Sequence, residues 1–204
     1  MFRTPFSFAL AAFAALTMTA PPAAADDAPI QLRKGDRVVF FGDSITQGGV
    51  SPKGYVTLVK AALAEKHKDL GIEVVGAGIS GNKVPDLQGR LEKDVLAKKP
   101  TVVVIYIGIN DVWHGENDPA RGTSVEKFEE GMKDIIARIQ KAGAKVIVCT
   151  PSVIGEKTGG ANELDKRLDT YSDLSRKVAK ETHSRLCDLR LVFADYLKDH
   201  IQKG

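Results

Sequence analysis

The stretch Phe41–Gly48, with the sequence FGDSITQG, organises this chain. It follows the apolar run Arg37–Phe41, which predicts a buried strand, and it precedes a helical pattern that begins near Tyr55. Gly42 allows the backbone to bend without a Cβ clash. We therefore expect Ser44 at the point where a strand ends and the chain turns toward a helix.

A serine at the end of a strand can serve two purposes. Its hydroxyl can cap the following helix, which is the commoner role. It can also act as the nucleophile of acyl transfer, because free backbone N–H groups beside it can stabilise the charge that develops on the substrate. Asp43 and Thr46 can hydrogen-bond the nearby backbone and hold this turn. The rest of the chain decides between the two roles of Ser44.

Composition indicates a single globular domain. The chain has 204 residues, of which 43% are hydrophobic and 27% charged, and its net charge is +3. The basic residues are scattered and form no stripe with interleaved aromatic residues, so we expect no nucleic-acid partner. Two cysteines, Cys149 and Cys187, are too few for a disulfide scaffold. They are expected as buried thiols, and a bond between them remains open if their strands are neighbours.

The first 25 residues have the pattern of a secretory signal peptide. Arg3 is followed by the apolar run Phe6–Ala20, two prolines and the small residues Ala23–Ala25. The apolar run is too short to span a bilayer comfortably, and no later stretch is apolar enough to do so. We expect residues 1–25 to be removed, residues 26–204 to form the domain, and the protein to be exported, to the periplasm or beyond the cell.

Apolar runs and amphipathic stretches alternate after this leader. Such a series of β–α units predicts a parallel sheet with helices on both faces, which is a three-layer α/β/α sandwich. Five strands favour the flavodoxin-like order 2-1-3-4-5. The expected strands are Arg37–Phe41, Ile72–Val75, Thr101–Ile107, Lys145–Cys149 and Arg185–Leu189, and the expected helices include Tyr55–Lys66, one capped by Thr123 with Glu126, and Leu191–Gln202.

In that order the loops after the first three strands converge on one edge of the sheet. The first loop carries Ser44, the second carries Gly81 and the third carries Asn110. The N–H of Gly81 can approach a substrate oxygen closely, the side-chain amide of Asn110 is a second donor, and the N–H of Ser44 is a third. Gly81 alone, or Asn110 alone, would be an ordinary turn-forming residue. Together they favour an oxyanion site around a nucleophile.

The second loop also contains the pattern G-x-G-x-x-G over residues 76–81, which is found in dinucleotide sites. The pattern follows the second strand rather than the first, and no acidic residue closes the next strand at the required distance, since Asp111 comes too late. A dinucleotide-binding oxidoreductase would also leave the placement of Ser44 unexplained. We therefore favour ester chemistry and expect no cofactor.

Three blocks carry a resemblance to a known family. Gly42–Ile45, Gly78–Gly81 and Gly108–Asp111 resemble the first three sequence blocks of the GDSL-type, or SGNH, hydrolases, in order and with typical separations. The resemblance covers nearly the whole chain after the leader. It implies an α/β/α fold, Ser44 as nucleophile, and an oxyanion hole made by Ser44, Gly81 and Asn110. Members of this family cleave carboxylic esters of carbohydrates, lipids and small alcohols without a metal.

One element of the family pattern has no counterpart. Its catalytic His lies in a D-x-x-H motif beyond a helix like Leu191–Gln202, and no such motif follows that helix before Gly204. The hypothesis that follows is a sequence truncated before this block. His114 lies in an Asp111-x-x-His114 pattern inside the third block, where it is expected to line the pocket or, less readily, to act as a substitute base. The other three histidines are expected away from the reactive edge of the sheet.

The resulting expectation is an exported serine esterase that acts on small acyl groups, possibly on carbohydrates. Asp43, Trp113 and His114 are the candidate substrate-binding residues. The alternative is a catalytically impaired domain of the same fold that binds acylated glycans, because binding would need no base. The expected partners are small-molecule or glycan esters, and the oligomeric state is not readable from the sequence.

Overall fold

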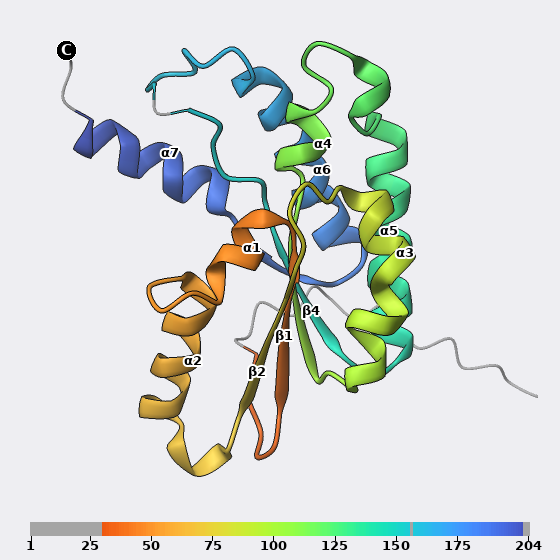
Figure 1. Cartoon of the computed structure of the whole chain (residues 1–204), viewed down its shortest axis with the longest axis vertical. Coiled ribbons are helices and arrows are strands. Elements are labelled where there is room, and N and C mark those ends of the chain that lie inside the picture. Colours follow the sequence, from red (N-terminus) through yellow and green to blue (C-terminus); the bar gives the residue numbers. More distant parts are fainter. Residues whose placement is uncertain (1–29, 156, 202–204) are drawn as a thin grey trace, which may run out of the picture.

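Five parallel strands form the centre of the molecule in the order β2-β1-β3-β4-β5, as predicted (Figure 1). The computed structural model describes residues 30–155 and 157–201, so the predicted signal peptide over residues 1–25 lies outside the described residues. The strands are β1 (Arg37–Gly42), β2 (Glu73–Gly78), β3 (Val102–Tyr106), β4 (Lys145–Cys149) and β5 (Arg185–Cys187).

Seven α-helices and three short 3₁₀ turns connect and flank these strands within the described residues. The helices are α1 (Ser44–Gly49), α2 (Tyr55–Lys66), α3 (Val84–Asp94), α4 (Ile109–Trp113), α5 (Val125–Lys141), α6 (Asp165–Glu181) and α7 (Leu189–His200). The 3₁₀ turns are Lys68–Leu70, Leu96–Lys98 and Pro119–Arg121. In the part of the chain that the structure describes, no helix combines the length and apolarity needed to cross a membrane.

The larger part of the core lies on the face of the sheet that α3, α5 and α6 cover (Figure 1). Most of the apolar stripe of α5 predicted from its 3.6-residue spacing is buried there: Phe128, Met132, Ile135, Ile136 and Ile139 are fully enclosed. The first predicted member, Val125, is 37% exposed. Val103 and Ile105 of β3 belong to this core, whereas Val102, Val104 and Tyr106 are buried on the opposite face, so the strand is apolar throughout its length.

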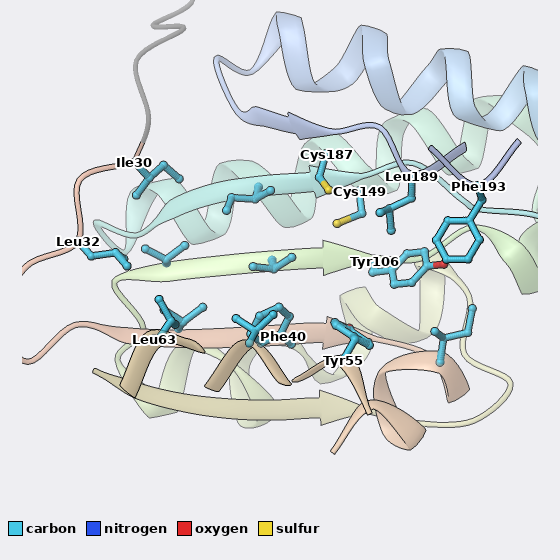
Figure 2. A pocket seen from close by; sticks show the side chains of 16 residues that line it. Ile30, Leu32, Phe40, Tyr55, Leu63, Tyr106, Cys149, Cys187, Leu189 and Phe193 are labelled. Atoms are coloured by element: carbon cyan, nitrogen blue, oxygen red, sulfur yellow. The ribbon is translucent and has the colours of Figure 1, made fainter. Parts of the chain in front are cut away.

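The opposite face of the sheet is covered only in part. α2 packs over the β2 side of this face, and α7 leads away from the sheet (Figure 1). Between them lies an apolar cleft of about 620 Å³, floored by side chains of β1, β3 and β4. Figure 2 shows Tyr55 and Leu63 on one flank of the cleft and Leu189 and Phe193 on the other. The predicted two-sided sandwich is therefore present, with one layer incomplete within the described residues.

One predicted helix face was wrong in part. The spacing in α2 predicts an apolar face that includes Leu58, yet Leu58 is 58% exposed and the buried residue of the helix is Val56. Tyr55, Val59 and Leu63 of this face border the cleft, and Leu58 is not among its lining residues.

Three local predictions were also wrong at the ends of elements. Residues 76–78, expected in the second loop, extend β2 and pair with the last residues of β1. The N-cap of α5 is Ser124 rather than Thr123, and its hydroxyl accepts the N–H of Lys127 at 3.3 Å. The third loop, expected to be irregular, contains the helix α4.

Candidate active site

Ser44 is exposed at the first position of α1, directly after β1. The preceding residue, Asp43, caps this short helix, since its carboxylate accepts the N–H of Ile45 at 2.9 Å. Asp43 is only 1% exposed, and burial raises the pKa of its carboxyl to about 6. The sequence predicted the position of Ser44 at the end of a strand, and the cap explains how its backbone is held there.

The second loop leaves β2 directly beside Ser44. A Cβ at Gly78 would lie 2.1 Å from the backbone nitrogen of Gln47, so only glycine permits β2 to pass this close to α1. The N–H of Ser80 then donates to the side-chain oxygen of Gln47 at 2.7 Å. Gly81 follows with φ +77°, in the left-handed region that favours glycine, and the nearest atom to its Cβ position is Cε1 of His114 at 3.9 Å. Open space therefore lies in front of Gly81.

Asn110 connects all three predicted loops. It is buried near the start of α4, and its side-chain Nδ2 donates to the carbonyl oxygen of Asn82 at 3.0 Å. The same nitrogen lies 3.5 Å from a carboxylate oxygen of Asp43. Asp43, which precedes Ser44, and Asn82, which follows Gly81, thus both contact the side-chain amide of Asn110. The predicted convergence of the loops is present in the fold.

Asp111, the neighbour of Asn110, fixes the third loop against α3. Its carboxylate is fully buried and accepts the N–H of Val84 at 3.0 Å. Burial raises the pKa of this carboxyl to about 6. Asp111 therefore acts as the support for the start of α3, which directly follows the loop that carries Gly81.

Arg90, on α3, is a supporting residue that the sequence motifs did not reveal. Its guanidinium donates to the carbonyl oxygen of Gly42 at 2.7 Å and to that of Ala77 at 3.0 Å. It also donates to the side-chain oxygen of Asn82 at 2.6 Å and lies 4.5 Å from the ring centroid of Phe41. One cation thus joins the ends of β1 and β2 and the second loop. An arginine on a helix is usually solvated, so the supporting role of Arg90 becomes visible only from its contacts in the folded structure.

The four histidines lie where the order of the elements placed them. His67 follows α2, His183 precedes β5 and His200 lies in α7, and all three are exposed. His114, at the end of α4, is partly buried and lies near Gly81. Among the histidines that the structure describes, His114 is the one at the reactive edge of the sheet.

Trp113 precedes His114 and is 53% exposed. The two ring centroids are 6.2 Å apart and the planes are tilted by 47°. The indole borders a second, polar cavity of about 250 Å³, with Glu116, Lys157 and Glu163 among its lining residues. The predicted substrate-binding residues therefore differ in position, with Asp43 enclosed beneath the turn and Trp113 facing outward.

The two cysteines are free thiols in neighbouring strands. Cys149 of β4 and Cys187 of β5 are directly opposite each other in the parallel register, and their sulfur atoms lie side by side in the apolar cleft (Figure 2). The thiol of Cys149 donates a hydrogen bond toward the sulfur of Cys187, which lowers the pKa of Cys187 to about 7 and raises that of Cys149. The neighbouring strands that a disulfide would require are present, while both thiols are reduced in this structure.

The arrangement at the reactive edge suits acyl transfer. It combines an exposed hydroxyl on Ser44, an approachable backbone N–H at Gly81 and a buried amide donor at Asn110. In addition, the sequence of residues 40–203 matches the GDSL-like lipase/acylhydrolase family.

Several proteins of known activity are similar to this chain. An acetylxylan esterase of Geobacillus stearothermophilus is 33% identical over 186 residues, which cover 83% of each chain. The crystal structure of the acetyl xylan esterase AlAXEase is 46% identical and superposes with a TM-score of 0.75, over 80% of this chain and 82% of that one. LAE5, an α/β hydrolase from the metagenome of Lake Arreo, is 32% identical with a TM-score of 0.76, over 84% of each chain.

Proposed function

Because this chain belongs to the GDSL-like lipase/acylhydrolase family and is an ester hydrolase homologous to acetylxylan esterases, we propose that it deacetylates xylan-type oligosaccharides through Ser44. The observation that carries this proposal is the meeting of Asp43, Asn82 and Asn110 at one amide group. That contact brings the ends of three strands together around the serine. The substrate class is proposed from the similar acetylxylan esterases, and the reaction is proposed from the contacts around Ser44.

In the proposed reaction the hydroxyl oxygen of Ser44 attacks the carbonyl carbon of an acetyl ester. The carbonyl oxygen becomes negatively charged and is held by the N–H groups of Ser44 and Gly81 and by the Nδ2 group of Asn110. One N–H of Asn110 is already bound to Asn82, whereas the contact with Asp43 is at the long limit of a hydrogen bond and can be exchanged for the substrate oxygen. Loss of the alcohol leaves an acetyl-serine, which water then hydrolyses.

A serine hydroxyl also needs a proton acceptor, because it is a weak nucleophile at its ordinary pKa. We assign His114 to the wall of the acyl site, where it faces Gly81. No D-x-x-H block follows β5 in these 204 residues. Serine hydrolases that lack a triad member keep a residual rate of about 10³ to 10⁴ over water from their oxyanion hole and substrate binding.

A second candidate function is a domain that binds acetylated glycans without hydrolysing them, because binding needs no proton acceptor beside Ser44. Both functions use the same site, and they differ in whether Ser44 reacts with the ligand. A binding domain would retain its affinity when Ser44 is replaced by alanine and would not react with a serine-directed inhibitor. An esterase would form a covalent adduct.

The test measures covalent labelling and acetate release in parallel. The protein is treated with a fluorophosphonate and digested, and the modified residue is identified by mass spectrometry. Acetate release from acetylated xylotetraose is compared between the wild type, Ser44→Ala and the control Ser51→Ala, which changes an exposed serine after α1. We expect a label on Ser44 and acetate release that only Ser44→Ala abolishes. Acetate release that survives Ser44→Ala would exclude Ser44 as the nucleophile, and an unlabelled Ser44 would favour the binding domain.

Export is a separate part of the proposal. It rests on the pattern of residues 1–25 alone, namely a basic start, an apolar run and a small-residue cleavage site. Expression of the full chain in a bacterium, followed by fractionation and N-terminal sequencing, should yield a periplasmic or secreted protein that begins at Asp26. Recovery of the uncut chain from the cytoplasm would refute it.

A further inference from the structure

We propose that the polar cavity beside Trp113 is a sugar-binding subsite that holds a pyranose ring of the xylan chain next to the acetylated unit. This inference rests on the proposed function for the identity of the ligand, but its site is separate from the acyl site. The cavity has a volume of about 250 Å³ and is formed between Trp113 and the segments before and after residue 156. It lies below the range of about 300 to 1,000 Å³ that drug-sized ligands occupy, and so suits one or two sugar rings.

The first argument is the exposure of Trp113. Large aromatic side chains are usually highly buried, and this one is 53% exposed although it belongs to the same short helix as the buried Asn110 and Asp111. An indole face is electron-rich, and the C–H groups on the face of a pyranose carry partial positive charge, so the two surfaces attract each other when they stack. A pyranose therefore matches this exposed face better than a flexible acyl chain would.

The second argument is the chemistry of the rest of the cavity. Its wall combines two carboxylates, Glu116 and Glu163, with the ammonium group of Lys157 and one aliphatic side chain, Ile154. Charges of both signs favour neither an anion nor a cation. They offer hydrogen-bond acceptors and donors in one small space, which suits a neutral ligand that is rich in hydroxyl groups.

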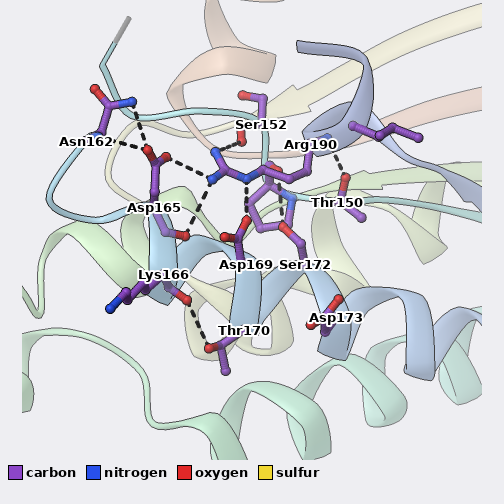
Figure 3. A network of polar contacts seen from close by, with 12 residues as sticks. Thr150, Ser152, Asn162, Asp165, Lys166, Asp169, Thr170, Ser172, Asp173 and Arg190 are labelled. Carbon is purple, nitrogen blue, oxygen red and sulfur yellow. Dashed lines mark hydrogen bonds and ion pairs between the residues drawn. The ribbon is translucent and has the colours of Figure 1, made fainter. Parts of the chain in front are cut away.

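The third argument is that both walls are held in place. On the side of Trp113, the guanidinium of Arg167 donates to the carbonyl oxygen of Gly115 at 2.9 Å. On the other side, Asn162 accepts the N–H of Lys157 at 3.1 Å and donates to the carboxylate of Asp165 at 3.1 Å. Asp165 in turn forms a buried ion pair with Arg190 at 2.8 Å (Figure 3). Preorganised walls reduce the ordering cost of binding a sugar.

The position of the cavity relative to Gly81 gives it a role in specificity. His114 lies between Gly81 and Trp113, with Cε1 at 3.9 Å from the Cβ position of Gly81 and its ring centroid at 6.2 Å from that of the indole. A sugar on Trp113 would therefore lie near the imidazole that borders Gly81. Trp113 should select oligosaccharide substrates over small esters without contacting the reacting atoms.

The experiment uses the fact that Trp113 is the only tryptophan in the sequence. Intrinsic fluorescence of the wild type and of Ser44→Ala is titrated with unacetylated xylotetraose, which carries no ester and therefore reports binding regardless of hydrolysis. We expect a saturable change in emission in both proteins. A flat titration would overturn the subsite, whereas the esterase proposal would be judged by acetate release alone.

Variants then measure the contribution of the indole. By calorimetry we expect Trp113→Ala to weaken binding of xylotetraose by about 3- to 10-fold and Trp113→Phe to retain most of the affinity, as for a lost aromatic contact. Tyr196→Ala is the matched control, since Tyr196 is a 57% exposed aromatic residue on α7. Circular dichroism checks that each variant folds. Unchanged affinity in Trp113→Ala, or an equal loss in Tyr196→Ala, would overturn the proposal.

Kinetics separate a subsite from a general effect on the enzyme. For Trp113→Ala we expect kcat/KM to fall with acetylated xylotetraose, mainly through KM, and to fall less with 4-nitrophenyl acetate, which carries no sugar to stack on the indole. An equal loss with both esters would mean that Trp113 supports the acyl site instead of binding sugar.

Discussion

The N–H of Val84 donates to the carboxylate of Asp111 across 3.0 Å, inside the protein and behind the oxyanion site. Burial raises the pKa of this carboxyl to about 6, and the same cause raises that of Asp43 to about 6. In the unfolded chain both would titrate near 3.8. The folded state therefore binds more protons than the unfolded state between these two values.

The sign of the pH dependence follows from that difference. The stabilising contribution of each protonated carboxyl is complete below pH 3.8 and is lost as the pH rises through about 6, at a cost on the order of 3 kcal/mol per group. We expect the melting temperature of the wild type to fall between pH 4.5 and pH 7. Asp111→Asn keeps an oxygen acceptor for Val84 and should flatten part of this slope, and an unaltered slope would contradict the assignment.

Arg90 should be required for the geometry of the site. Arg90→Ala leaves the carbonyl oxygens of Gly42 and Ala77 without their donor and removes the cation from the ring of Phe41. We expect a loss of about 2 to 4 kcal/mol in the free energy of unfolding, measured by urea denaturation, and a fall in kcat for acetate release. Arg138→Ala, which removes a half-exposed arginine from α5, should cost less than about 1 kcal/mol.

A fall in kcat also after Arg90→Lys would show that the planar fork of the guanidinium is needed rather than its charge. Equal stability of Arg90→Ala and Arg138→Ala would mean that the contacts of Arg90 contribute nothing.

Gly78 should tolerate no side chain. A Cβ there would lie 2.1 Å from the backbone nitrogen of Gln47, and neither β2 nor α1 can move without disturbing the pairing of β1. We expect Gly78→Ala to cost about 3 kcal/mol or more in urea denaturation. Gly48→Ala, in the neighbouring helix α1, is the control, because a Cβ there meets nothing within 4 Å, and it should be neutral or stabilise by up to about 1 kcal/mol. Similar values for the two variants would contradict this account.

Cys187 should react faster with alkylating agents than an ordinary thiol. The hydrogen bond from Cys149 lowers its pKa to about 7, so a large fraction is thiolate at pH 7.5, while Cys149 is buried and kept protonated. Alkylation by iodoacetamide, followed by mass spectrometry, should modify Cys187 first. Cys149→Ala removes the hydrogen bond and should slow the reaction. Faster modification of Cys149 would contradict the assignment.

The sequence was sufficient for the sheet and for the residues around Ser44 because both depend on local signals. Apolar runs at regular spacing predicted the strands and their order, and the blocks around Gly81 and Asn110 follow strands that the order places next to each other. The role of Arg90 could not be predicted, because it depends on three contacts from α3 to segments 8 to 48 residues away. Likewise, the spacing in α2 could not show that its neighbour on the sheet is missing from the described residues.

The apolar cleft between α2 and α7 also determines how this chain behaves once it is isolated. An apolar cleft with Ile45 and Phe193 exposed at its rim should adsorb to phenyl resins, take up detergent and promote association as concentration rises. Kosmotropic salts strengthen hydrophobic association. Low ionic strength and a mild surfactant should therefore keep the chain in solution.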